Sequence, residues 1–171
     1  WNVRLNASYN TNHNKVLSIG NAVPFAIGGF SSRTVQTVVA EGQPVGFIRG
    51  YKAVLNSDNS LKEILPLQNL GSTLPTGYGN FSLSASYKNL SLMINGDYQY
   101  GAYVHSFDRQ FRFSKGLKDG AIPEKALEGL DQGANWLNFT NFFVEKSDFV
   151  KIRNIGISYD YKPEKYLKNI N

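Results

Sequence analysis

The strongest constraint on the fold is a regular alternation of apolar and polar residues in residues 81–100. Its first half places apolar side chains at Phe81, Leu83, Ala85 and Tyr87, with serines or lysine between them. After Asn89 the pattern resumes and continues to Tyr100. Successive side chains of a strand point to opposite faces, so this pattern predicts two strands with one apolar and one polar face. The sequence therefore predicts a hairpin that turns at Lys88 and Asn89.

Two other segments show the same period. The first ends at Tyr9 and has its apolar positions at Trp1, Val3, Leu5, Ala7 and Tyr9. The second has them at Ile155, Ile157, Tyr159 and Tyr161. Val150 and Ile152 lie in the opposite phase, which predicts a β-bulge near Arg153. Weaker patterns at residues 34–40 and 45–54 bring the expected total to about six strands.

The predicted connections alternate in length. Short turns are expected at residues 41–44, 88–89 and 162–163, and long polar segments at residues 11–33, 55–79 and 102–148. In an up-and-down meander this arrangement places all short turns at one end and all long loops at the other. Outer-membrane barrels have this asymmetry, with the long loops outside the cell. Within the longest loop, residues 123–131 predict a helical turn that Pro123 opens.

Strand length and tyrosine placement favour a membrane barrel over a soluble sheet. The predicted strands are about nine to eleven residues long, which fits a tilted crossing of a bilayer. Six tyrosines lie on the apolar side near strand ends, where an amphipathic ring is stable at the headgroup level: Tyr9, Tyr87, Tyr98, Tyr100, Tyr159 and Tyr161. The polar side suits a hydrated lumen. About six strands leave open edges, so we expect them to belong to a larger barrel.

Several classes of function have little support in the sequence. The chain has no cysteine, so a disulfide framework, a thiolate metal site and a cysteine nucleophile are excluded. Its two histidines, His13 and His105, fall in different predicted loops without metal-ligand spacing. No glycine-rich phosphate loop is present. The net charge of +5 is scattered, which argues against nucleic acid. We expect no cofactor, no metal and no enzymatic activity.

Four segments, in order, resemble the SusC/RagA-like TonB-dependent outer-membrane transporters of Bacteroidetes. They are WNVRLNASYNTNHNKVLSIG, VVAEGQPVGFIRGY, LGSTLPTGYGNFSLSASYKNLSLMINGDYQYG and VEKSDFVKIRNIGISYDY. The likeness lies in a Glu-Gly-x-Pro-Val-Gly segment, a Tyr-Lys-Asn hairpin and an Asp-Phe segment before the last strand. The chain departs from the family pattern at Ile152, where leucine is usual, and at Ile48 and Arg49, where an aromatic residue is common.

The resemblance implies that residues 1–171 form part of the barrel domain of a transporter of about 22 strands in the bacterial outer membrane. Such a transporter imports large nutrients, either oligosaccharides or peptides. A SusD-like surface lipoprotein would act as its lid, and the TonB complex would supply energy through a plug and a TonB box outside these residues. The remaining partners would be the lipid bilayer and lipopolysaccharide.

The longest loop contains the residues best suited to ligand contact, namely Tyr103, Phe107, Arg109 and Trp136. Aromatic rings stack on sugars or on peptide side chains, and arginine donates a planar fork of hydrogen bonds. The same residues could instead pack the loop on itself. The densest basic run, Arg109 to Lys118, could be a solvated loop or could contact an anionic ligand or lipopolysaccharide. Two other functions remain open, a soluble β-sandwich that binds carbohydrate and a passive outer-membrane pore.

Overall fold

The computed structural model describes residues 1–20, 23–30 and 35–161, which form two compact units. Unit 1 consists of Trp1–Thr11, Gly77–Gln99 and the described residues from Phe149 onward. Unit 2 consists of Asn12–Thr76 and Tyr100–Asp148, with the same gaps at residues 21–22 and 31–34. The strand pairings are antiparallel in both units, so the predicted antiparallel β class is confirmed. The described helices include none that is long and apolar enough to span a membrane.

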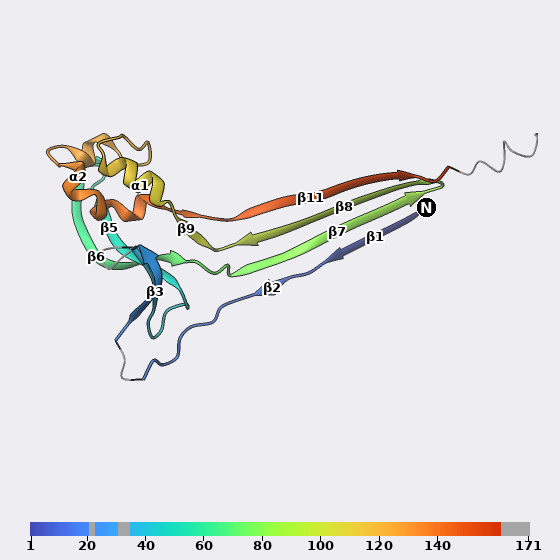
Figure 1. Ribbon diagram of the computed structural model, residues 1–171, viewed down its shortest axis with the longest axis horizontal. Helices are drawn as coiled ribbons and strands as arrows, with labels where there is room; N and C mark the ends of the chain where they lie inside the picture. The colour runs from blue at the N-terminus through green and yellow to red at the C-terminus, as the bar shows by residue number, and fades with distance from the viewer. Residues whose placement is uncertain (21–22, 31–34, 162–171) are drawn as a thin grey trace, which may run out of the picture. The chain divides into compact units, whose positions relative to one another are not determined.

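Unit 1 is an extended antiparallel sheet (Figure 1). Its strands are β1 (Asn2–Ala7), β2 (Asn10–Thr11), β7 (Gly77–Tyr87), β8 (Leu90–Tyr100) and β11 (Phe149–Tyr159). Their order is β1-β7-β8-β11, and β2 also pairs with β7. The predicted hairpin is confirmed, because β7 and β8 are joined at Lys88 and Asn89. Lys88 has a φ of 53°, in the left-handed region that such tight turns require.

The two faces of this sheet differ in polarity. Leu5 lies opposite Leu83, and Ile157 lies opposite Leu92, whereas Ser158 lies opposite Ser91. Directly opposite residues share a face. The apolar face therefore contains Val3, Leu5, Ala7, Phe81, Leu83, Ala85, Leu90, Leu92, Ile94, Val150, Ile152, Ile155, Ile157 and Tyr159. The polar face contains Asn2, Arg4, Asn6, Ser82, Ser84, Ser86, Ser91, Asn95, Asp97, Lys151, Asn154 and Ser158.

The predicted bulge in the last strand is confirmed. The register between β8 and β11 shifts between Ile152 and Asn154, which leaves Arg153 as the extra residue. The shift returns Val150 and Ile152 to the apolar face. The guanidinium group of Arg153 forms a two-point ion pair with Asp97 of the polar face, with Nη2 donating to Oδ2 over 2.9 Å. A single inserted residue thus keeps the strand in phase and adds an ion pair on the polar side.

Two glycines on the apolar face lie beneath aromatic rings. A Cβ atom at Gly96 would lie 2.2 Å from the ring of Phe81, so this ring occupies the space above the glycine. The hydroxyl group of Tyr98 lies over Gly79 and donates to the carbonyl oxygen of Ser8 over 2.8 Å. Ser8 falls between β1 and β2, so the tyrosine closes a short gap in that edge strand. These rings compensate for the missing glycine side chains.

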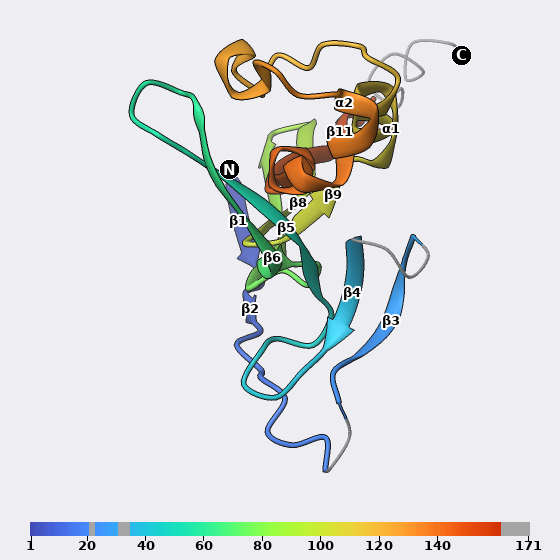
Figure 2. The ribbon, with the colours of Figure 1, turned by 90° about the vertical axis from the view of Figure 1, so that its left-hand side faces the viewer.

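Unit 2 contains a second sheet with the order β3-β4-β5-β6 (Figure 2). Its strands are β3 (Phe25–Phe30), β4 (Val35–Val39), β5 (Phe47–Leu55) and β6 (Leu61–Ser72). The weaker predicted strands are confirmed as β4 and β5. The prediction of long loops at residues 11–33 and 55–79 is wrong in part, because these segments contain β3 and β6. The sequence pattern did not predict β6 because Pro66 interrupts it. Proline is tolerated at this position since β6 lies at the edge of the described sheet and needs fewer backbone N–H donors.

The prediction of one meander of about six strands is also wrong. Strands β4 and β5 belong to the second sheet, and none of the described sheets closes into a barrel. The physical reason is the burial of Val38, Phe47, Ile48 and Ala53. Strand β5 has buried residues at consecutive as well as alternate positions, namely Phe47, Ile48 and Gly50, unlike the strands of unit 1. The predicted turn at residues 162–163 lies outside the described residues.

The longest predicted loop folds into a small helical insert within unit 2. Its elements are β9 (Tyr103–His105), α1 (Phe107–Ser114), the 3₁₀ helix η1 (Glu124–Leu127), α2 (Gln132–Asn135), the 3₁₀ helix η2 (Trp136–Phe143) and β10 (Val144–Lys146). Strand β9 pairs with β10 and closes the base of the insert. The predicted helical turn after Pro123 is confirmed as η1. Helix α1 was not predicted, because charged residues interrupt its apolar positions.

We expect Gly96→Ala to lower the free energy of unfolding by about 1–3 kcal/mol, the usual effect of overpacking. The new Cβ would lie 2.2 Å from the Phe81 ring and 2.6 Å from the carbonyl oxygen of Lys151. The matched control is Gly156→Ala in the neighbouring strand, where the Cβ would meet only Met93, at 4.0 Å. Urea unfolding of the full-length protein measures both variants. Equal losses in the two variants would contradict the packing described above.

Candidate functional site

The helical insert is fixed to strand β5 by a side-chain amide and an aromatic core. Asn141 accepts a hydrogen bond from the Ala53 backbone nitrogen over 2.9 Å and donates to the Ala53 carbonyl oxygen over 3.3 Å. It therefore binds the strand as a neighbouring strand would. Phe113 is fully buried, and its ring lies 5.7 Å from that of Phe139 and 5.6 Å from that of Phe143. The insert thus has a core that can hold surface side chains in place.

A buried amide connects three elements of the insert. Gln110 of α1 is fully buried, and its Nε2 donates to the carbonyl oxygen of Trp136 over 3.1 Å and to Thr140 Oγ1 over 3.0 Å. Thr140 in turn donates to the carbonyl oxygen of Leu137 over 2.7 Å. Because both amide protons are used, Gln110 Oε1 is the atom that accepts from His105 Nε2, 2.5 Å away. The network assigns the Nε2–H tautomer to His105.

His105 is most stable in its neutral form at this position. Burial lowers the pKa of its imidazole, and the hydrogen bond to Gln110 opposes this shift only in part. Desolvation penalises the charged form of a buried histidine. We therefore assign His105 to the internal network of the insert.

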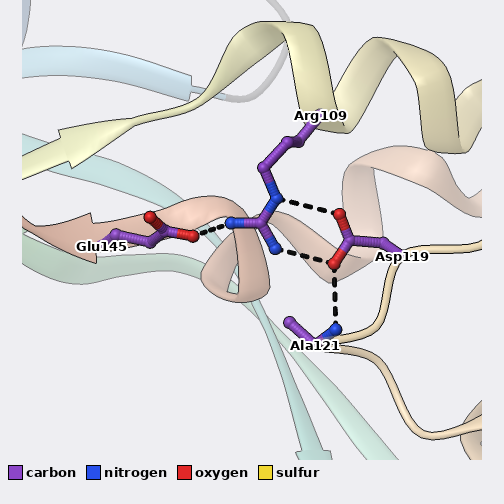
Figure 3. Close-up of polar contacts among 4 residues, drawn as sticks. All are labelled: Arg109, Asp119, Ala121 and Glu145. Carbon is purple, nitrogen blue, oxygen red and sulfur yellow. Dashed lines mark hydrogen bonds and ion pairs between the residues drawn. The ribbon is translucent and has the colours of Figure 1, made fainter.

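Arg109 binds two carboxylates of the insert (Figure 3). Its Nε and Nη2 donate to the two oxygens of Asp119 over 2.9 Å and 2.7 Å, and its Nη1 pairs with Glu145. Asp119 also accepts from the Ala121 backbone nitrogen over 3.0 Å. The hydrogen bonds from Arg109 lower the pKa of Asp119, and those to Asp119 raise the pKa of Arg109. Arg109 thereby joins α1, the loop after it, and β10.

A group of aromatic rings lies on and beside helix α1. The ring of Phe107 stacks on that of Phe111 with centroids 6.0 Å apart. The ring of Trp136 contacts the Phe107 ring edge-on, with centroids 6.4 Å apart. Phe111 is 47% exposed. The Nζ atom of Lys115 lies 5.2 Å from the centre of the Phe111 ring, in a cation–π contact. Phe107, Phe111 and Lys115 therefore form a continuous stripe, which we call the α1 stripe.

The four residues predicted for ligand contact do not form one cluster. Phe107 and Trp136 come together, whereas the Tyr103 ring packs on Gly71, where a Cβ would lie only 2.4 Å from it. Arg109 is bound by carboxylates. Phe111 was not among the predicted residues, although its spacing of four from Phe107 would have placed both on one helix face.

Two further lysines of the insert form ion pairs. Lys118 binds Glu124 over 2.5 Å, and Lys125 binds Asp58 of the β5–β6 turn over 2.7 Å. These contacts lower the pKa values of both carboxyl groups. Within the described ranges, we find no group of three or more metal-ligating side chains. The arrangement is suited to binding through aromatic and charged groups.

No protein-family model and no curated protein matches this sequence. The function is therefore inferred from the residues and the geometry of the two units.

We expect the free energy of unfolding to fall as the pH drops below about 6.5, the ordinary pKa of histidine. The pKa of His105 is lowered in the folded state, so the unfolded state binds more protons in this range and acid favours it. His105→Asn should reduce this dependence on pH. His13→Asn, at an exposed position, should leave it in place. Urea unfolding at a series of pH values measures the slope, and an equal slope in wild type and His105→Asn would refute this role.

We expect Arg109→Lys to destabilise the insert by about 1–2 kcal/mol, because lysine cannot make the two-point contact with Asp119. Lys118→Met is the matched control, since it removes an ion pair whose side chains are 80% and 79% exposed. That variant should change stability little. Amide hydrogen exchange across residues 107–146 would locate the loss. Equal protection in the two variants would show that Arg109 does not hold the insert together.

Proposed function

We propose that this chain is a segment of a TonB-dependent importer in the bacterial outer membrane. In this proposal, the strands of unit 1 cross the bilayer as part of a larger barrel of about 22 strands. Unit 2 is exposed outside the cell. The importer takes up oligosaccharides or peptides, a SusD-like lipoprotein covers its outer opening, and the TonB complex drives transport through a plug outside these residues. The sequence resemblance motivates this proposal.

The observation that carries the proposal is the exposed apolar face of unit 1. Ile155 is 60% exposed and Leu5 is 70% exposed, although both lie in the interior of regular strands. Nothing else among the described residues of unit 1 covers this face, since the unit consists of one sheet. A large exposed apolar surface in water is unfavourable and marks an interface with lipid or protein. Lipid on one face and a hydrated lumen on the other fit the two polarities.

Strand length and tyrosine exposure also support this proposal. Strands β7, β8 and β11 each have 11 residues, which suits a tilted bilayer crossing. Exposed tyrosines occur at Tyr9, Tyr87, Tyr100, Tyr159 and Tyr161. Several lie at strand ends, where the headgroup region would accommodate their amphipathic rings. A soluble sandwich would instead need a second sheet over the apolar face.

Fractionation of cells that express the full-length protein tests location and partner together. We expect the protein in the outer membrane, where mild detergent should release it with a SusD-like lipoprotein identifiable by mass spectrometry. Recovery as a soluble protein that needs no detergent would contradict the proposal and favour the carbohydrate-binding sandwich. The passive pore would be favoured if the protein is recovered in the outer membrane and solutes diffuse through it without TonB.

Adjacent substitutions in β11 test which face meets lipid. We expect Ile155→Arg to prevent assembly in the membrane, since an arginine on the lipid face near the bilayer centre costs roughly 2–4 kcal/mol. Asn154→Arg places the same charge on the polar face and should be tolerated. The readout is the fraction of folded protein in the outer membrane, taken from its heat-modifiable migration on gels. Equal assembly of both variants would argue against lipid on the apolar face.

A further inference from the structure

We propose that the exposed side of helix α1 binds an acidic oligosaccharide. Arg112 and Lys115 would hold its carboxylate or sulfate groups, and Phe107 and Phe111 would contact its sugar rings. This inference rests on the proposed function and deepens it, because it names the class of nutrient that the insert meets outside the cell. It depends on three features of α1, which are the distribution of its charges, the geometry of its rings and the absence of a strand edge.

The basic run of the sequence contains two cations that are bound by carboxylates in the folded insert and two that are not. Arg109 is bound by Asp119 and Glu145, and Lys118 is bound by Glu124. Neither cation is available without breaking an ion pair. Arg112 and Lys115 form no ion pair with any described carboxylate. Both are exposed. Two cations three residues apart on a helix lie on neighbouring positions of one face, so they can hold one anionic group or two adjacent ones.

The position of Lys115 joins this charge to the aromatic rings. Its Nζ atom lies 5.2 Å from the centre of the Phe111 ring, and Phe111 stacks on Phe107 with an angle of 28° between the rings. An anion bound to Lys115 therefore lies beside an exposed aromatic surface. Sugar rings have apolar C–H faces that pack on aromatic side chains. An acidic sugar satisfies both neighbours at once, whereas a neutral sugar leaves the cations without a partner.

Two carboxylates oppose such a ligand: Asp119, which is bound by Arg109 and also interacts electrostatically with Arg112, and Asp108. Asp108 lies four residues before Arg112 and is exposed on the same side of the helix. No ion pair joins the two side chains, so the carboxylate of Asp108 weakens the local positive potential without neutralising Arg112. Removal of the Asp108 charge provides a variant in which binding should improve.

The surface of α1 suits a saccharide better than an acidic peptide. Extended peptides are commonly bound by addition to a strand edge, which supplies unpaired backbone groups. The α1 stripe has no strand edge to which an extended peptide could add. Recognition along the stripe therefore uses ring faces and side-chain charge. An acidic peptide that outcompetes the saccharide would therefore contradict this inference.

The test is isothermal titration calorimetry with the full-length protein. The probe is a trimer of galacturonic acid, and the neutral comparison is a galactose trimer. We expect binding of the acid alone, weaker at high salt because the contacts are exposed. Arg112→Gln and Lys115→Gln should each weaken it about tenfold, the usual effect of losing one charge-assisted hydrogen bond. Phe111→Ala should also weaken it, whereas Asp108→Asn should strengthen it about two- to threefold.

Lys118→Gln is the matched control, since it removes a cation that is already paired, and its affinity should stay within about twofold of wild type. Equal binding of the neutral trimer, absence of binding, or unchanged affinity in Lys115→Gln would overturn the inference. So would binding of lipopolysaccharide or a glutamate peptide in place of the soluble acidic trimer. Titration is independent of location and uptake. Failure to bind in a protein that fractionates with the outer membrane would refute the ligand class alone, and binding by a soluble protein would refute the importer alone.

Discussion

The alternation of side chains across unit 1 is the constraint on which the rest of the structure depends. A strand shifted by one residue would exchange its two faces, so each strand of this sheet must keep its phase over its whole length. Arg153 makes this possible in β11, because the bulge corrects a mismatch between Ile152 and Ile155 and the ion pair with Asp97 holds the extra residue on the polar side. Gly96 lets the Phe81 ring lie across the neighbouring strand.

The insert of unit 2 follows a different rule, because its interior contains a polar network as well as aromatic rings. Gln110 is fully buried and uses its amide group to connect His105, Trp136 and Thr140. Buried polar groups are costly when unpaired, so this network favours one arrangement of the helices over others. Arg109 adds a second connection at the surface. Together they place the α1 stripe on a rigid support, and a rigid binding surface loses less entropy when a ligand binds.

The sequence predicted those parts of the fold in which one physical rule acts alone. In unit 1 every long strand has two distinct faces, so period-two alternation predicted the hairpin and even the bulge near Arg153. In unit 2, strand β6 contains Pro66 and pairs with β5 through several register shifts, so local pattern failed. The residues predicted for ligand contact show the same division, and their role stays a prediction. Phe107 and Trp136 were predicted from residue type, but the pairing of Arg109 with Asp119 depends on contacts between separate elements, which spacing alone does not encode.

In the proposed importer, lipid covers one face of unit 1 and water covers the other. The chain has no cysteine, so single cysteines can be placed in turn at residues 154–159 of the full-length protein and labelled with nitroxides. In reconstituted bilayers, collisions with oxygen report lipid exposure and collisions with a nickel chelate report water exposure. We expect high oxygen access at residues 155, 157 and 159 and high chelate access at residues 154, 156 and 158. Chelate access at all six positions would contradict this proposal.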